Sequence, residues 1–367
     1  MNDIRVAIIG VGNCASALYQ GLTYYKNNKI AGLIREKIGG YTINNIKVVA
    51  AFDVDERKVG KSMADAIVEK PNCTPLFVKR EEMEEGPIVQ MGNVLDGIAN
   101  HMKDVPENEG FRVSNRVCVD IIKVLRENKA DVLINYLPVG SQEATEFYAN
   151  CSIEAKVPFL NCIPVFIASN PIWGAKFKKA GIPIIGDDMK SQFGASILSQ
   201  MYQELAFARG HKVKCHIQRN VGGNTDFLNM VDQSRLKSKK MSKENVIRSQ
   251  DDIRSIVSDT FFHAGPSEYI RYLEDKKVAN ITIEMEGFMG SPVLVETRLE
   301  VIDSPNSAGI VIDAIRYLKV AHELGISGPL KGPSAFTQKS PPQQLKLSDA
   351  IKECDNLSNR QYFSLND

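Results

Sequence analysis

The amino-terminal segment contains a glycine-rich turn with the spacing of a dinucleotide-binding site. Residues 5–10 (RVAIIG) form an apolar run that predicts a strand, and residues 15–22 predict a helix. Between them stands the pattern G-x-G-x-x-A, from Gly10 to Ala15. The first glycine permits a tight turn, the second lets the backbone approach a pyrophosphate, and the helix N-terminus favours an anion. The pattern predicts a nucleotide site, although a glycine turn without a ligand can have the same sequence.

Asp53 follows the second apolar run, residues 47–52 (KVVAAF), and could accept hydrogen bonds from the hydroxyls of an adenosine ribose. Its charge would repel a 2′-phosphate, so it favours NAD over NADP. Asp53 lies 43 residues after Gly10, whereas the usual separation is about 20. The longer separation is explained if residues 24–46, which are irregular and contain glycine, are an insertion.

A polar segment in the middle of the chain could bind phosphate. Residues 184–192 (IIGDDMKSQ) place two acids, a lysine and a serine where a strand meets a long helix. The backbone amides of Ser191 and Gln192 could hold a phosphate at the start of that helix. Equally, Asp187 or Asp188 could simply cap the helix.

Two further segments carry side chains that could bind an anion or a sugar. Residues 220–229 (NVGGNTDFLN) could form an anion-binding backbone nest, or an ordinary surface turn. In residues 237–243 (KSKKMSK), a helix would place Lys239 and Lys243 on one face, which is mildly destabilising without an anion between them. A solvated charged surface is the more common explanation of such a run.

The elements that must position these residues follow a doubly wound α/β pattern. Continuous apolar runs at 5–10, 47–52, 131–136, 157–161 and 182–185 alternate with helical patterns such as 117–128 and 141–155. Residues 70–108, rich in Pro, Glu and Asn, are expected to loop over the surface. After residue 191 we expect a helix over 191–209, two alternating strands over 277–286 and 292–302 in an antiparallel sheet, a helix over 307–324 and a Pro/Ser/Lys-rich tail.

Composition excludes several classes of protein. Lys+Arg number 45 and Asp+Glu 44, giving a net charge of +1, so we expect neither nucleic acid nor a membrane surface as the main partner. No apolar run approaches the ~18 residues of a membrane span. The seven cysteines are scattered without a CxxC, which favours reduced thiols in a cytoplasmic protein, and no secretory leader is expected. The five histidines show no zinc-ligand spacing.

Together, eight sequence blocks resemble the myo-inositol-1-phosphate synthase family, in particular its short bacterial and archaeal branch. The blocks occur in the family's order: GVGNCAS (10–16), AAFDVD (50–55), YLPVGS (136–141), GDDMKSQ (186–192), NVGGNTDFLN (220–229), SKKMSK (238–243), IDSPNSAG (302–309) and KSPP (339–342). The resemblance implies conversion of glucose 6-phosphate to 1D-myo-inositol 3-phosphate. In that reaction NAD oxidises C5, the C6 enolate attacks the C1 aldehyde, and NADH then reduces C5.

The resemblance also assigns roles to individual residues. Lys277 and Lys339 would hold the oxygens at C5 and C1. Lys239 would shuttle the C5 proton, and Lys243 would reach the phosphate together with Lys277. Asp188 joins these four lysines in the catalytic set. The implied substrate contacts are Ser191, Gln192, Asn220, Asn224 and Lys243; the implied cofactor contacts are Gly10, Gly12, Asn13, Cys14, Asp53, Pro138, Gly140, Asp188, Ser191, Asp226, Lys239 and Asp303.

Further implications concern the cation and the assembly. Asp303 is the candidate ligand of a divalent or monovalent cation. Residues 1–190 with 305–367 would form a Rossmann-type NAD-binding domain, and residues 191–304 an inserted α+β domain for catalysis and oligomerisation in a homotetramer. The chain departs from the longer eukaryotic members at residues 191–194, where Ser-Gln-Phe-Gly replaces Ser-Gly-Gln. Two alternatives stay open: an ordinary two-domain NAD-dependent dehydrogenase, and a catalytically silent NAD-binding regulator.

Overall fold

The computed structural model describes residues 2–26, 30–232 and 261–361. A seven-stranded parallel sheet lies at the centre of its larger part. Its strands are β1 (Ile4–Ile9), β2 (Ile46–Asp53), β3 (Val89–Met91), β4 (Val132–Asn135), β5 (Phe159–Asn161), β6 (Pro183–Ile185) and β11 (Gly328–Pro329). They lie in the order β11-β6-β5-β4-β1-β2-β3, and every pairing is parallel. The strand order reverses between β1 and β4, where ligands of such sheets bind. The doubly wound α/β prediction is confirmed.

Helices cover both faces of this sheet because its strands are apolar on both sides. Val6 and Ile8 of β1 pack in a core with α1 (Asn13–Tyr24), α9 (Asp303–Glu323) and α11 (Leu347–Ser358). Ala7 and Ile9 face the opposite way, into a core with α3 (Ile121–Glu127), α4 (Gln142–Ala155) and α5 (Pro171–Ala180). This is the expected burial of strands in a parallel sheet.

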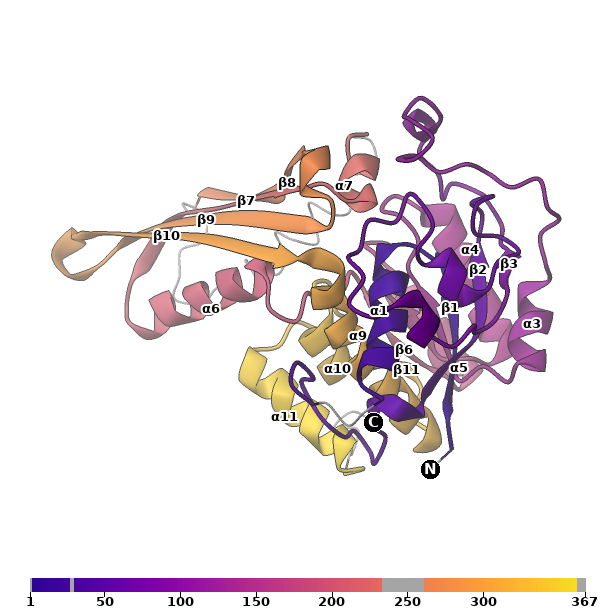
Figure 1. Ribbon diagram of the computed structural model, residues 1–367. Helices are drawn as coiled ribbons and strands as arrows, with labels where there is room; N and C mark the ends of the chain where they lie inside the picture. The colour runs from indigo at the N-terminus through magenta and orange to yellow at the C-terminus, as the bar shows by residue number, and fades with distance from the viewer. Residues whose placement is uncertain (1, 27–29, 233–260, 362–367) are drawn as a thin grey trace.

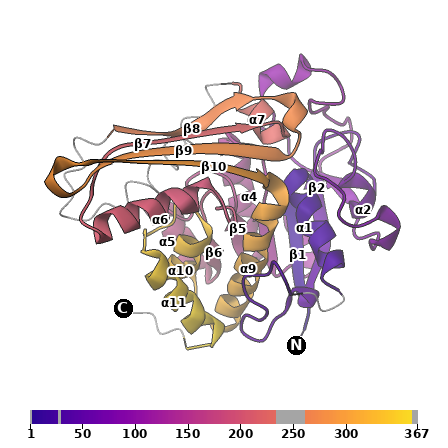
Figure 2. The ribbon, with the colours of Figure 1, turned by 60° about the vertical axis from the view of Figure 1, so that its left-hand side comes forward.

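A second, four-stranded sheet projects from the side of the first (Figures 1 and 2). Its strands are β7 (Lys212–Gly222), β8 (Phe261–Tyr269), β9 (Lys276–Glu286) and β10 (Pro292–Ile302), in the order β10-β9-β7-β8. Helix α6 (Ala195–Ala208) packs on one face, and α7 (Thr225–Asn229) follows β7. The antiparallel pairing predicted for residues 277–286 and 292–302 is confirmed, because β9 and β10 pair antiparallel, whereas β7 and β8 pair in parallel.

Helix boundaries differ from the sequence prediction where capping residues decide them. Helix α3 begins at Ile121 rather than at residue 117, because the Asp120 side chain accepts a hydrogen bond from the Lys123 amide at 3.0 Å. Helix α6 begins at Ala195 rather than at residue 191, with Gly194 at its N-cap. The shorter helices are α2 (Met63–Ala66) and α10 (Lys331–Thr337), and 3₁₀ turns occupy Ile43–Asn45, Arg80–Glu82, Asn100–Lys103, Arg271–Leu273 and Phe288–Gly290.

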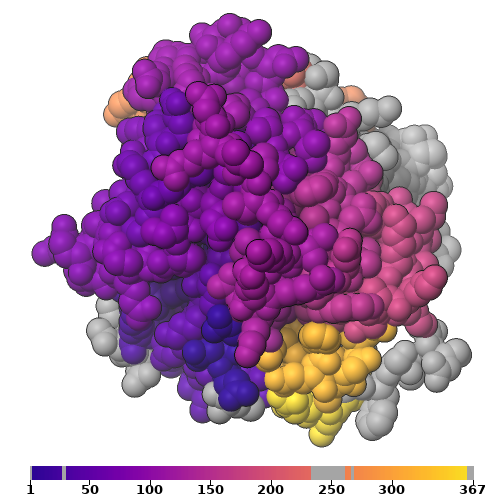
Figure 3. Space-filling model, turned by 90° about the vertical axis from the view of Figure 1, so that its right-hand side faces the viewer, coloured from indigo at the N-terminus to yellow at the C-terminus, as the bar shows by residue number. Residues whose placement is uncertain are grey.

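Residues 355–358 of α11 pack against residues 35–39. The Ser358 carbonyl accepts a hydrogen bond from the Gly39 amide at 2.9 Å, and Asp355 forms an ion pair with Arg35 at 2.9 Å. Figure 3 shows the C-terminal region, in gold and yellow, beside the indigo N-terminal segment on one face of the molecule. The predicted tail, residues 328–342, therefore contains β11 and α10 and belongs to the folded body, and α11 follows it. Among the described helices, none is long and apolar enough to cross a membrane.

Candidate active site

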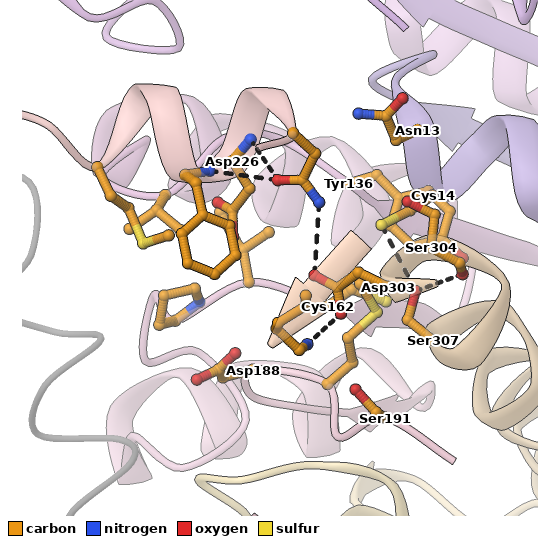
Figure 4. Close-up of a pocket in the computed structure, with 18 of the residues that line it drawn as sticks. Asn13, Cys14, Tyr136, Cys162, Asp188, Ser191, Asp226, Asp303, Ser304 and Ser307 are labelled. Carbon is orange, nitrogen blue, oxygen red and sulfur yellow. Dashed lines mark hydrogen bonds and ion pairs between the residues drawn. The ribbon is translucent and has the colours of Figure 1, made fainter. Parts of the chain in front are cut away.

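A cleft lies where the C-terminal ends of the first sheet's strands meet the start of the second sheet (Figure 4). Figure 4 shows Asn13 and Cys14 at one side of the cleft, and Asp188, Ser191, Asp226 and Asp303 around it. The cleft brings together twelve of the residues singled out in the sequence: Gly12, Asn13, Cys14, Pro138, Asp188, Ser191, Asn220, Asn224, Asp226, Lys277, Asp303 and Lys339. Lys239 and Lys243 lie outside the described residues.

The glycine turn has the form that a dinucleotide requires. Gly10 has a φ of +86°, and a Cβ there would lie 2.8 Å from the Tyr136 carbonyl oxygen, so a side chain is excluded. At Gly12, by contrast, no described atom lies within 4 Å of a Cβ position, and the residue borders the cleft. Gly12 is also the N-cap of α1, which has no side-chain cap among the described residues. The space at Gly12 and the uncapped helix start fit a pyrophosphate.

Val11, between the two glycines, is held on both sides of its backbone. The Asp53 carboxylate accepts a hydrogen bond from the Val11 amide at 2.6 Å. Lys58 Nζ donates to the Val11 carbonyl at 2.8 Å and to Asn72 Oδ1 at 2.8 Å, and Asn72 Nδ2 also donates to that carbonyl at 3.2 Å. Lys58 is fully buried, and burial lowers its pKa while Asp53 and Asp55 oppose that shift.

Asp53 thus lies directly behind the turn and is not among the residues that line the cleft. Its second oxygen accepts hydrogen bonds from the amides of Val54 (2.7 Å) and Asp55 (2.9 Å). Gly10 and Gly140, both with positive φ, likewise form turns at the edge of the sheet without lining the cleft.

Two lysine–aspartate pairs face the cleft. Lys339 Nζ lies 2.8 Å from Asp188 Oδ1, and their side chains are 13% and 4% exposed. Lys277 pairs with Asp303 in the same way. Ammonium groups held in a cleft that excludes most water can stabilise negative charge on a substrate oxygen far better than in bulk solvent.

Lys339 is brought to the cleft by a short backbone pairing between distant segments. The Asp187 amide donates to the Ser340 carbonyl and the Ser340 amide to the Asp187 carbonyl, both at 2.9 Å. The Lys339 amide donates to the Asp188 carbonyl at 2.7 Å. Two segments about 150 residues apart in the chain are therefore locked together beside the cleft.

The alternative that Asp187 or Asp188 caps a helix is wrong. Asp187 accepts hydrogen bonds from the amides of Ile167, Ala168 and Ser169, and from the Asn161 side chain, at 2.7–3.1 Å. Burial raises the pKa of Asp187 to about 6, against the effect of these hydrogen bonds. Asp187 is thus a buried anchor for the loop after β5, and only Asp188 faces the cleft.

Gln192 points away from the cleft, contrary to the predicted phosphate contact. Its amide donates to the Asn306 carbonyl at 2.7 Å, and its side chain donates to the Gly32 carbonyl at 2.8 Å. The physical reason is the late start of α6, because residues 191–194 form a loop that folds against the start of α9. Ser191 remains at the cleft.

The segment 220–229 forms neither of the two expected turns. Asn220 lies within β7, and Asn224 caps α7, its Oδ1 accepting from the amides of Asp226 (3.1 Å) and Phe227 (3.3 Å). Asn224 Nδ2 donates to Asp303 at 3.4 Å and to Asp275 at 3.3 Å.

Asp275, which lies behind the cleft and contacts Asn224 and Ser304 of its lining, was not identified from the sequence. It is 1% exposed and accepts hydrogen bonds from the Ser304 hydroxyl (2.7 Å) and amide (3.3 Å). Burial and the neighbouring Asp303 raise its pKa to about 6, with the Ser304 hydrogen bond opposing. The described residues contain no group of three or more His, Cys, Asp or Glu arranged to hold a metal ion. A cation at Asp303 stays a prediction.

Comparison with known proteins identifies the family. Residues 194–304 match the sequence model of the myo-inositol-1-phosphate synthase family. The chain is 47% identical to inositol-3-phosphate synthase of Mycolicibacterium smegmatis over 94% of each protein, and 46% identical to that of Corynebacterium glutamicum over 94% of this chain and 95% of the other. The fold matches a myo-inositol-1-phosphate synthase-related protein from Thermotoga maritima (TM-score 0.81, 24% identity, 97% and 98% coverage). The chain is therefore an enzyme of the inositol-3-phosphate synthase family.

Proposed function

We propose that this enzyme cyclises D-glucose 6-phosphate to 1D-myo-inositol 3-phosphate, with NAD used and regenerated in each turnover. The observation that carries the proposal is the pairing of Lys339 with Asp188 and of Lys277 with Asp303 in the cleft that also contains the glycine turn. An ordinary hydride transfer needs few cations, whereas a reaction through an enolate and an alkoxide needs positive charge at more than one oxygen.

The cofactor would lie along the turn and the strand ends. Bound NAD would supply hydride transfer at C5 of the sugar, in both directions. Gly12 leaves room for the pyrophosphate, and Asn13 and Cys14 form the first turn of the helix beneath it. Asp53, behind Val11, is the candidate partner of the adenosine ribose, and Pro138, Gly140, Ser191, Asp226 and Asp303 are candidates for the remaining contacts.

The lysines would stabilise the charged oxygens of the substrate. With a ketone at C5, the C6 proton becomes acidic, and the resulting enolate attacks C1. Lys277 would hold the oxygen at C5, and Lys339 the oxygen that becomes an alkoxide at C1. Asp188 and Asp303 keep these ammonium groups in place. By family resemblance Asn220 and Asn224 would orient hydroxyls, and Asn224 would do so by exchanging its hydrogen bond to Asp303 or Asp275 for one to the substrate. For Lys239 and Lys243 we propose the C5 proton shuttle and phosphate binding, by family resemblance alone.

The test is incubation with glucose 6-phosphate and a substoichiometric amount of NAD, with and without a chelator. We expect inositol phosphate to exceed the added NAD, with no accumulation of NADH. Stoichiometric NADH would instead indicate an ordinary dehydrogenase, and NAD binding without turnover a silent regulator. Lys339→Met should lower kcat about 100-fold or more, the usual cost of removing one group that stabilises an oxyanion. Lys352→Met, at an exposed position on α11, is the matched control.

A further inference from the structure

Four buried polar side chains form a hydrogen-bonded chain that runs along β7 to the cleft. His216, Gln218 and Asn220 alternate along the strand and therefore lie on one face of the sheet, and Ser199 faces them from α6. All four are 0–2% exposed. The distances are 3.0 Å from His216 Nε2 to Ser199 Oγ, 3.0 Å from Ser199 Oγ to Gln218 Oε1 and 3.2 Å from Gln218 Nε2 to Asn220 Oδ1.

A backbone carbonyl fixes the direction of every hydrogen bond in the chain. Asn220 Nδ2 lies 3.1 Å from the Gly265 carbonyl oxygen, which can only accept, so the Asn220 amide nitrogen must face it. The Asn220 oxygen then accepts from Gln218 Nε2. The Gln218 oxygen in turn accepts the Ser199 hydroxyl proton, which leaves the Ser199 oxygen to accept from His216 Nε2.

The direction of these hydrogen bonds determines which donors of Gln218 and Asn220 remain available to a ligand in the cleft. Gln218 and Asn220 both line the cleft, and each amide nitrogen has a second N–H beyond the one used in the chain. Hydrogen bonds arranged head to tail polarise one another, which strengthens the remaining donors. If both side-chain amides were flipped, the Asn220 carbonyl oxygen would face the Gly265 carbonyl oxygen, and these two acceptors would repel each other.

A cation stands next to these donors. Lys277 pairs in register with Gly222, two positions beyond Asn220 on β7, so its side chain lies on the same face of the sheet. The wall of the cleft therefore presents two amide N–H groups followed by an ammonium group. Such a row of donors suits the oxygens of a hydroxylated, anionic ligand.

We propose that Gln218 binds a sugar oxygen of the substrate beside Asn220, and that Ser199 and His216 are positioning residues that fix the Gln218 amide. This inference rests on the proposed function for the identity of the sugar phosphate. Burial lowers the pKa of His216 to about 4, so its imidazole stays neutral at the pH values where the enzyme would be assayed. The hydrogen-bond direction is thus maintained throughout that range.

The experiment compares three variants and one control variant with the wild type. The measurement is calorimetric titration, in the presence of NAD, with glucitol 6-phosphate, an open-chain polyol phosphate that cannot cyclise. Gln218→Glu replaces the amide by an acceptor-only carboxylate, so we expect binding at least 30-fold weaker. His216→Phe removes the donor to Ser199 and should weaken binding about 5- to 10-fold. His216→Gln keeps a donor at the position of Nε2 and should bind nearly as the wild type does. The dissociation constant of NAD should stay unchanged in all three.

Gln203→Leu is the matched control. Gln203 lies one helical turn after Ser199, is fully buried, and neither of its amide atoms has a hydrogen-bond partner within the described structure. We expect this variant to bind the polyol phosphate like the wild type. If His216→Phe does not fold, Ser199→Ala interrupts the chain at its next member and gives the same comparison.

The outcomes separate this inference from the proposed function. Wild-type affinity in Gln218→Glu, or equal affinities in His216→Phe and His216→Gln, would overturn the inference even if the wild type forms inositol phosphate. If the wild type forms no inositol phosphate, the proposed function fails, and the titration still decides whether Gln218 contacts a sugar phosphate. A wild-type protein that does not bind glucitol 6-phosphate would overturn the inference.

Discussion

Val11 shows how residues outside the cleft can govern what the cleft binds. Its amide and carbonyl are held by Asp53 and Lys58, and the carbonyl also by Asn72. A fully buried ammonium group is costly to maintain, so its retention needs compensating hydrogen bonds. We infer that Lys58 keeps the peptide of Val11 rotated so that the amides after Gly12 stay directed at the cofactor.

Lys58→Met should therefore weaken NAD binding. Methionine matches the volume of the lysine stem but leaves Asn72 Oδ1 and one lone pair of the Val11 carbonyl without a donor. We expect the dissociation constant of NAD, measured by calorimetry, to rise about 10-fold, which corresponds to ~1.4 kcal/mol. The KM for glucose 6-phosphate should change little, because Lys58 does not line the cleft.

The control for this prediction is Lys61→Met, three residues further along. Lys61 is partly exposed and pairs with Glu69 at 2.5 Å, away from the turn. Equal NAD affinities in Lys58→Met and Lys61→Met would show that the buried ammonium group does not position the turn. Lys58 could not be identified from the sequence, since a lysine within the charged segment DERK looks like a surface residue until Val11 and Asn72 are seen to meet it.

Two glycines of the turn between β1 and α1 should respond differently to substitution by alanine, one by losing stability and the other by losing nucleotide binding. Gly10→Ala should destabilise the protein by several kcal/mol, because the positive φ and the contact of 2.8 Å with the Tyr136 carbonyl both oppose a side chain. Gly12→Ala meets no described atom within 4 Å, at a φ of −90° that alanine adopts readily. We expect this variant to keep the wild-type melting temperature and lose NAD binding at least 100-fold.

A third glycine provides the comparison for both variants. Gly21 lies inside α1 with no described atom within 4 Å of a Cβ position, so Gly21→Ala should raise stability by up to about 1 kcal/mol and leave NAD binding unchanged. Thermal denaturation and NAD titration of the three variants distinguish the cases. Undiminished NAD binding in Gly12→Ala would mean that the pyrophosphate does not lie over this turn.

The sequence predicted five of the seven strands of the first sheet and missed two, because β3 lies in residues 70–108, which were expected to loop over the surface, and β11 lies in the predicted tail. The five predicted strands are short apolar runs whose side chains the two cores bury, whereas β3 and β11 have only three and two residues and show no such run. The starts of α3 and α6 were misplaced by four residues each, because Asp120 and Gly194 set them locally. The parallel pairing of β7 with β8 was not predicted, because the sequence of a strand does not specify the direction of its partner.

At the scale of the whole molecule, the site is assembled from segments that only the complete fold brings together. The sequence blocks named most of its residues through family resemblance, but the backbone pairing of residues 187–190 with 337–340 and the buried Asp275 came from the structure alone. Lys339 depends on a C-terminal region that looked like a tail. We infer that residues 1–190 and 305–367 act as the nucleotide-binding unit, and residues 191–304 as the unit that completes the cleft and joins subunits.

The four-stranded sheet is the surface through which we expect the chain to form a homotetramer. β10 is an edge strand of eleven residues in the sheet of the described residues, and an edge strand of that length favours association. Leu294 on β10 is 59% exposed, and Phe288 and Met289 in the adjoining turn are 87% and 89% exposed. These exposed apolar residues lie in or next to the turn between β9 and β10, which projects away from the first sheet (Figure 1).

Light scattering on the purified protein should give four times the mass of one chain, and Leu294→Glu should shift it to a smaller species because a charge would be buried at the contact. Leu76→Glu changes a leucine of similar exposure, 57%, in the other part of the molecule, and should leave the mass unchanged. A monomeric wild type would contradict the homotetramer. A Leu294→Glu variant that stays tetrameric would show that the subunit contacts lie elsewhere. Since the cleft lies at the base of this sheet, a dissociated variant that still binds NAD but turns over slowly would show that assembly supports the second sheet's share of the site.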